Sequence, residues 1–199
     1  MLTSEGIALT FIAIVGLCVG SFLNVVATRV PERIAIGATR SACSSCQAPI
    51  RWYDNVPLLS YLVLRGRCRD CHERFSPLYP AVELASAALV AGSVARFGLT
   101  PEMGVAAAFC LVLVVLSAID VTHRIVPNRI VVPATAVALV AQTVIHPSPE
   151  WVIASAAAFT GFLLFALAKP GGLGMGDVKL AALLGAVLGR DVATGLMIG

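Results

Sequence analysis

Residues 6–28 form an uncharged stretch of 23 residues between Glu5 and Arg29. A helix that crosses a membrane needs about 20 consecutive apolar residues. No basic segment precedes this stretch, and the first basic residue, Arg29, follows it, which is unlike the pattern of a cleaved signal peptide. We therefore expect a retained transmembrane helix at the start of the chain.

Further apolar runs occupy residues 80–97, 103–119, 130–145 and 151–168. Only 13% of the residues are charged and the mean hydropathy is +0.91, which leaves too little polar surface for a water-soluble domain. The fold class that follows is an all-α polytopic membrane protein, a helix bundle.

The last part of the chain differs from these long runs. A shorter apolar run, 178–189, follows a glycine-rich stretch, and another begins at 192 and stops at 199, too short to span a membrane. We therefore expect a C-terminal truncation. Three parts are predicted: a first transmembrane helix (1–28), a polar loop (29–79) and a multispan membrane core (80–199), incomplete at its C-terminus.

The few charges indicate which side of the membrane each connection occupies. If the arginine-rich segment 29–74 is cytoplasmic, the N-terminus lies outside and the connections 120–129 and 169–179 lie inside. Of the 14 Lys and Arg residues, only Arg96 and Arg190 are then outside, as the positive-inside rule requires. Glu83, near the start of the second apolar run, can face headgroups or a cavity.

Four of the six cysteines form two Cys-x-x-Cys pairs, Cys43 with Cys46 and Cys68 with Cys71. Such pairs can present four thiolates to zinc in a tetrahedron. Disulfides are the alternative, but the inferred cytosolic side is reducing and disfavours them. His72 is a weaker candidate ligand. We expect a structural zinc ion that stabilises a cytoplasmic loop too small to build its own core.

Two aspartates are placed at cytoplasmic ends of apolar runs. Asp120 follows the run 103–119, and Asp177 follows Gly174-Met-Gly. Simple solvation at the interface, or an ion pair with Arg124 or Lys179, would explain such residues without catalysis. Two carboxylates that lie close together can instead share a proton, so that one activates a water and the other polarises a peptide carbonyl. That is the chemistry of an aspartyl protease.

Five motifs together resemble the prepilin peptidases, also called type IV leader peptidases. They are Gly20-Ser-Phe-Leu-Asn-Val-Val-Ala-Thr-Arg29-Val-Pro31, the two cysteine pairs, Ile50-Arg-Trp-Tyr-Asp-Asn-Val-Pro-Leu-Leu-Ser60, Ala118-Ile-Asp120 and Gly174-Met-Gly-Asp177. The resemblance extends from about residue 16 to residue 189. Two features depart from the family: Leu78-Tyr-Pro80 stands where it often has Arg-Tyr-Pro, and its members usually continue through further spans.

The resemblance implies an aspartyl protease of the bacterial inner (cytoplasmic) membrane that removes the basic leader of type IV prepilins or pseudopilins. Asp120 and Asp177 match the catalytic aspartates, and the four cysteines match a zinc-binding loop. Cysteine-containing members also methylate the new N-terminus with S-adenosylmethionine. By resemblance alone, Gly20, Ser21, Asn24 and Arg29 are predicted to contribute to binding of this methyl donor. The expected partners are prepilins and membrane lipid, with no nucleic acid.

Two other functions stay open. A methyltransferase without proteolysis would account for the zinc loop, although no Gly-x-Gly-x-x-Gly signature of a soluble cofactor-binding fold is present. A noncatalytic transporter or assembly scaffold would account for ionisable residues among several spans, although no inverted repeat is evident.

Overall fold

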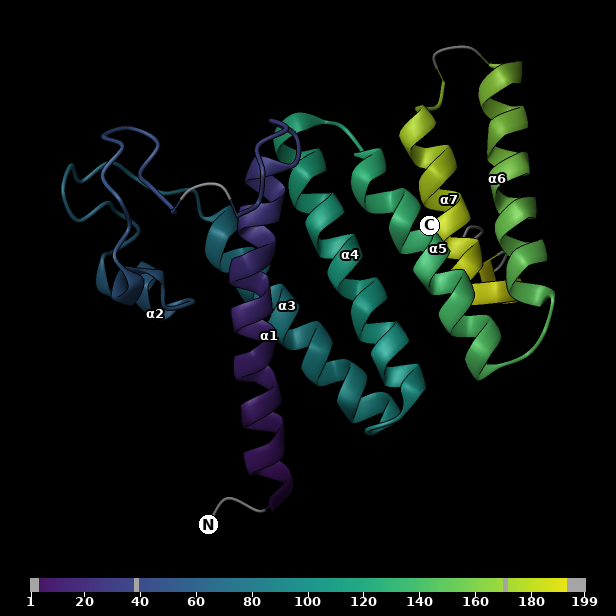
Figure 1. Cartoon of the computed structure of the whole chain (residues 1–199), viewed down its shortest axis with the longest axis horizontal. Coiled ribbons are helices and arrows are strands. Elements are labelled where there is room, and N and C mark those ends of the chain that lie inside the picture. Colours follow the sequence, from purple (N-terminus) through teal and green to yellow (C-terminus); the bar gives the residue numbers. More distant parts are fainter. Residues whose placement is uncertain (1–3, 38–39, 170–171, 193–199) are drawn as a thin grey trace.

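The computed structural model describes residues 4–37, 40–169 and 172–192, and within them the regular structure is helical (Figure 1). Two isolated bridges, Ala42 with Pro49 and Arg67 with Arg74, are the β-type pairings described. The elements are α1 (Ser4–Arg29), η1 (Trp52–Asn55), α2 (Leu59–Val63), α3 (Leu78–Phe97), α4 (Pro101–His123), α5 (Asn128–Ile145), α6 (Glu150–Ala168), α7 (Met175–Leu188) and η2 (Gly189–Asp191).

Local sequence explains where the long helices begin and end. Gly98 ends α3 with a φ of 67°, a conformation that glycine adopts without strain. The Thr100 hydroxyl then accepts a hydrogen bond from the Met103 N–H, and Pro101 occupies the first turn of α4. At the other end of α4, Arg124 adopts a left-handed conformation and its N–H donates to the Asp120 carbonyl at 2.8 Å.

Among the residues that the structure describes, five helices are long and apolar enough to cross a membrane: Ala8–Arg29 within α1, and the whole of α3, α4, α5 and α6. They correspond to the five long apolar runs of the sequence, so the prediction of an all-α polytopic membrane protein is confirmed. The shorter predicted run, 178–189, covers most of the 14-residue helix α7 and ends at the first residue of η2. The final apolar segment of the sequence begins at residue 192, and its residues 193–199 lie outside the described residues.

The long helices stand side by side in the order α1, α3, α4, α5, α7, α6, and consecutive members of this series pack together (Figure 1). The chain order is therefore broken once, where α7 inserts between α5 and α6. Buried apolar side chains join α4 to both neighbours: Ile119 packs with Val82 of α3, and Leu116 packs with Val131 of α5 and Leu183 of α7. This arrangement brings the start of α7 beside the α4–α5 connection.

Glycines allow two helix pairs to approach closely. A Cβ at Gly20 would lie 2.7 Å from the Glu83 Cα in α3, and one at Gly185 would lie 2.6 Å from the Ala154 carbonyl oxygen in α6. A hydrogen bond between α6 and α7 accompanies the second contact: the Ser155 hydroxyl donates to the Ala182 carbonyl at 2.8 Å. Small residues and polar side chains are the usual means of helix association in lipid, where apolar burial gives little advantage.

We expect Gly185→Ala to destabilise the bundle by about 1–3 kcal/mol, because its methyl group would have to push the α6 backbone away. Gly104→Ala in α4 is the matched control, since a Cβ there meets nothing within 4 Å. The free energy of unfolding of both variants can be measured by titrating the reconstituted protein with a denaturing detergent. Equal stability of Gly185→Ala and wild type would contradict the close α6–α7 packing.

Candidate functional site

Asp120 lies in the last turn of α4, where its side chain is exposed. The residues just before it, Ala118 and Ile119, are buried in the contact with α1 and α3. The helix ends four residues after Asp120, at the left-handed Arg124. Helix packing therefore fixes the backbone of Asp120 while leaving its carboxylate accessible.

Asp177 lies in the first turn of α7 and is also exposed. Its Oδ2 atom accepts a hydrogen bond from the Gly174 N–H at 3.2 Å, which caps the start of the helix. The next residue, Val178, is completely buried and anchors this turn in the bundle. Asp177 thus projects from a rigid helix start.

The α4–α5 connection packs directly against the start of α7. A Cβ at Gly176 would lie 2.9 Å from Val126, so only glycine permits this approach without a shift. One turn further into α7, the Lys179 Nζ donates to Asn128 Oδ1 at 2.7 Å. The end of α4 and the start of α7 lie at the same end of the bundle (Figure 1). Asp120 lies in the last turn of α4 and Asp177 in the first turn of α7, so both aspartates belong to this end.

Neither aspartate is neutralised by the basic residues that the sequence suggested as partners. Among the described residues, the ion pairs of acidic side chains involve Asp54, Glu102 and Glu150. Lys179 instead contacts an amide oxygen. Both carboxylates are therefore free of ion pairs within the described part of the chain.

The four predicted cysteine ligands come together in the loop between α1 and α3. Their Sγ atoms all lie within 4.8 Å of one another, with 3.8 Å between Cys43 and Cys71 and 3.9 Å between Cys46 and Cys68. All four are free thiols. A zinc ion with four Zn–S bonds of about 2.3 Å requires sulfurs about 3.8 Å apart, so the cluster can hold a metal ion.

Each cysteine pair sits on the same type of backbone turn. The Cys43 N–H donates to the Ala48 carbonyl and the Gln47 N–H donates to the Cys43 carbonyl, both at 3.0 Å. Cys68 and His72 repeat this pattern, with bonds of 2.8 and 3.1 Å. Gln47 and His72 both have a φ near 60°, which is uncommon for residues other than glycine. The Cys-x-x-Cys spacing predicted the ligands but not this repeated turn.

The electrostatics of the cluster favour a bound cation. The backbone N–H groups of Cys46 and Ser45 lower the pKa of Cys43 to about 7. At Cys71 the Glu73 N–H favours the thiolate, but desolvation and hydrogen bonds with the other three cysteines raise the pKa to about 12. Four thiolates this close repel one another, and a divalent metal ion would supply the compensating charge.

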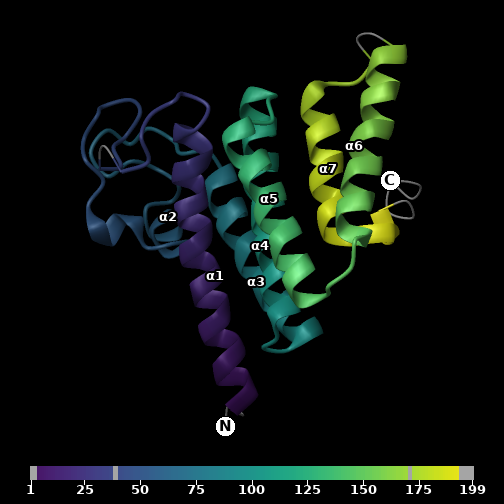
Figure 2. The same cartoon turned by 45° about the vertical axis from the view of Figure 1, so that its right-hand side comes forward.

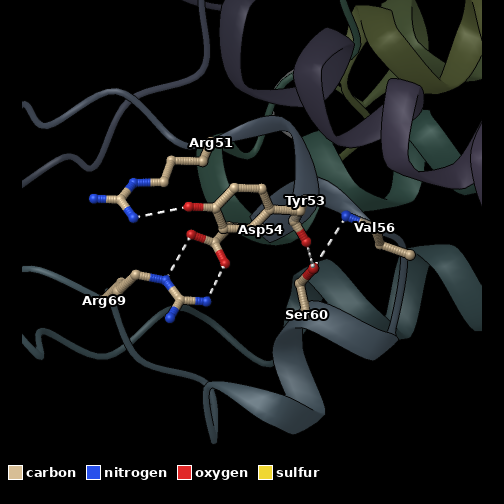
Figure 3. A network of polar contacts seen from close by, with 6 residues as sticks. All are labelled: Arg51, Tyr53, Asp54, Val56, Ser60 and Arg69. Atoms are coloured by element: carbon tan, nitrogen blue, oxygen red, sulfur yellow. Dashed lines mark hydrogen bonds and ion pairs between the residues drawn. The ribbon is translucent and has the colours of Figure 1, made fainter.

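A polar network ties the second cysteine pair to the segment 51–60 (Figure 3). Arg69, next to Cys68, forms a two-bond ion pair with Asp54, at 2.9 Å from Nε and 2.5 Å from Nη2. This contact lowers the pKa of the Asp54 carboxyl. Arg51 donates to the Tyr53 hydroxyl at 2.8 Å, and Ser60 donates to the Tyr53 carbonyl at 3.1 Å.

We expect Asp54→Asn to accelerate loss of the metal to a competing chelator by roughly three- to tenfold, because Arg69 then no longer holds the second cysteine pair against residues 51–60. The exposed neighbour Asp70 provides the control Asp70→Asn. Metal release followed with a coloured chelator at neutral pH measures the rates. Equal rates for Asp54→Asn and wild type would show that the ion pair does not support the cluster.

The residues predicted to bind the methyl donor lie along the end of α1. Gly20 packs against α3, and the buried Asn24 side chain donates to the Tyr79 carbonyl at 3.0 Å. Ser21 is half-buried, and Arg29 donates to the Ile36 carbonyl. Gly20 and Asn24 therefore serve helix packing. The role of these four residues in cofactor binding stays a prediction.

Glu83 has a contact that the sequence did not indicate. Its side chain is buried rather than facing headgroups, and its Oε2 accepts a hydrogen bond from the Leu58 N–H at 2.7 Å. Leu58 precedes α2 and has a φ of 61°. The bond thus joins the cysteine-containing loop between α1 and α3 to a membrane helix.

The structure thus defines a multi-pass helical membrane protein with a four-cysteine cluster that can hold a metal ion and two exposed aspartates at one end. The model of the bacterial peptidase A24 N-terminal domain matches residues 14–97, and that of the type IV leader peptidase family matches residues 107–198. The chain belongs to the type IV leader peptidase family, as its motifs predicted, and is a multi-pass bacterial membrane protein.

Curated relatives carry the name prepilin leader peptidase/N-methyltransferase. The Bacillus subtilis protein is 36% identical, with 91% of this chain and 74% of the relative aligned. The Myxococcus xanthus protein is 37% identical over 94% of this chain and 58% of its own length, and the Klebsiella pneumoniae protein is 34% identical over 90% and 85%. The search of solved structures found no match.

Proposed function

We propose that this chain removes the leader peptide of type IV prepilins or pseudopilins by aspartyl proteolysis, with Asp120 and Asp177 as the catalytic pair. The observation that carries the proposal is the contact of Gly176 with Val126, which holds the start of α7 against the α4–α5 connection. Two exposed carboxylates without ion-pair partners among the described residues flank that contact. The names of the relatives support the same activity.

The chemistry requires one carboxylate to accept a proton from a water molecule while the other donates a proton to the scissile carbonyl oxygen. The water attacks the carbonyl carbon and gives a tetrahedral diol. As the carbon–nitrogen bond breaks, the proton taken from the water passes to the leaving nitrogen, and the second carboxylate takes back the proton that it gave to the carbonyl oxygen. The capped start of α7 and the packed end of α4 hold the two groups on rigid helices. Rigid placement of both groups lowers the entropic part of the barrier.

We place this end of the bundle at the cytoplasmic face of the bacterial inner membrane. With this orientation, all Lys and Arg residues except Arg96 and Arg190 lie in cytoplasmic segments or their borders. By family resemblance, a prepilin has an apolar segment within the bilayer and a basic leader in the cytosol. Its scissile bond then lies at the membrane boundary, at the level of the two aspartates.

We also propose that the cysteine cluster holds a structural zinc ion and that the chain methylates the new N-terminus. Four cysteines leave no open coordination position for a substrate, which favours a structural role. S-adenosylmethionine would supply the methyl group as a second substrate. The relatives' N-methyltransferase name supports this second activity.

The purified chain in lipid nanodiscs, supplied with a prepilin from the same bacterium and labelled S-adenosylmethionine, tests both activities. Mass spectrometry of the product should find the leader removed and one methyl group on the new N-terminus. Methylation of a precleaved pilin without any leader removal would favour the methyltransferase alternative. Neither reaction from a folded, zinc-loaded chain would favour a transporter or scaffold.

A further inference from the structure

The short helix α2 lies beside the bundle rather than beyond its end. Figures 1 and 2 both show it next to the upper half of α1, below the level at which α1 ends. The hydrogen bond from Leu58 to Glu83 fixes this level, because Glu83 lies five residues inside α3. At a rise of about 1.5 Å per residue, that is about 7 Å below the start of a membrane-spanning helix.

The backbone at this contact is itself unusual. Leu58 adopts a φ of 61° and a ψ of −48°, and the Leu59 N–H bonds back to the Pro57 carbonyl at 2.6 Å. A leucine in this region is strained, and such a conformation persists only when its surroundings hold it. The buried Glu83 carboxylate is the group that receives the Leu58 N–H.

The segment η1–α2 presents an apolar patch of four large, mostly exposed side chains: Trp52 by 83%, Leu59 by 60%, Leu62 by 62% and Val63 by 75%. Leu59, Leu62 and Val63 share one face of α2, because residues three and four apart are neighbours on a helix surface. In a water-exposed loop this patch would be unfavourable. Apolar side chains of this kind are favourable at the boundary between headgroups and acyl chains, which is where the level of Glu83 would bring them.

The charges around this patch suit such a position. Arg51, Arg65 and Arg67 are exposed near it. Two of the acidic groups around it are engaged elsewhere, because Asp54 pairs with Arg69 (Figure 3) and Glu83 accepts from Leu58. The exposed Asp70 offsets part of the positive charge at Arg51. Segments with apolar side chains on one face and basic ones at the margin bind at membrane surfaces, more strongly when the lipids are anionic.

We propose that η1 and α2 form an in-plane segment that lies in the lipid interface, with Trp52, Leu59, Leu62 and Val63 in contact with lipid. The cysteine-containing loop is then attached to the membrane at three points: its covalent link to α1, its covalent link to α3 and this apolar face. Glu83 is the positioning residue that sets the depth of the segment. This inference does not depend on the proposed proteolysis.

Tryptophan fluorescence in liposomes tests the proposal, because the chain has two tryptophans, Trp52 and Trp151. Trp151→Phe leaves Trp52 as the only emitter, and Trp52→Phe is the matched control that isolates Trp151. In vesicles of phosphatidylcholine and phosphatidylglycerol, we expect blue-shifted Trp52 emission with little quenching by acrylamide. Lipids brominated near the headgroup should quench roughly half of the Trp52 emission.

The proposal would be overturned by red-shifted Trp52 emission that is quenched by acrylamide but is not quenched by brominated lipid. Emission shielded from both quenchers would also overturn it, because protein and not lipid would then cover the patch. If Trp151→Phe does not fold, the difference between wild type and Trp52→Phe gives the same signal.

Glu83→Ala in the single-tryptophan background tests the depth control. We expect the variant, if it still binds zinc, to show red-shifted and acrylamide-accessible Trp52 emission. Unchanged emission would overturn the role of Glu83.

Discussion

Asp120→Asn and Asp177→Asn should each lower the rate of leader removal by at least about 10³-fold, because each replacement removes a group that must accept or donate a proton. Asparagine keeps the size of the side chain and can still accept the Gly174 N–H at position 177, so the helix start is preserved. Mass spectrometry of a prepilin incubated with each purified variant in nanodiscs measures the rate.

Asp191→Asn is the matched control for these variants. Asp191 is also exposed, but it lies in η2, beyond the far end of α7. Its replacement should leave the rate within about twofold of wild type. Cleavage retained by both Asp120→Asn and Asp177→Asn would contradict the two-carboxylate mechanism.

Cys43→Ser should abolish stoichiometric zinc binding, with an affinity loss of at least about 100-fold. Cys43 is almost completely buried and lies 3.8 Å from Cys71, so no solvent group can take its place without opening the cluster. Elemental analysis of the purified protein measures the metal content. Limited proteolysis should find new cleavage between residues 40 and 74, while circular dichroism should show the membrane helices retained.

Cys18→Ser separates this effect from the general loss of a thiol. Cys18 is exposed on α1 and has no part in the cluster. This variant should bind one zinc ion per chain, like the wild type. A folded wild-type protein that contains no zinc, or a Cys43→Ser variant that retains it, would contradict the assignment.

The membrane helices could be predicted from the sequence because apolar length carries the signal directly. The run 151–168 became α6 with one added residue, and 130–145 became α5 with two. The insertion of α7 between α5 and α6 could not be predicted. It depends on local fits such as Gly185 against Ala154, and many apolar surfaces offer similar burial.

The candidate site was predictable to a different extent in its two parts. Cys-x-x-Cys spacing is a short-range geometric signal, so all four ligands could be named before their 4.8 Å cluster was known. Counting spans placed Asp120 and Asp177 on one side, but the Gly176–Val126 contact is a tertiary fit with no motif. The Leu58–Glu83 bond was missed because any backbone N–H can serve a buried carboxylate.

The most direct test of the catalytic pair is the leader-removal rate of the double variant Asp120→Asn/Asp177→Asn beside both single variants, with enzyme in excess over prepilin. If the two carboxylates act as one unit, the second replacement should hardly lower the rate any further, so all three rates should agree within about threefold. A double variant slower by the product of the two single losses would show that the aspartates act independently and would contradict the account.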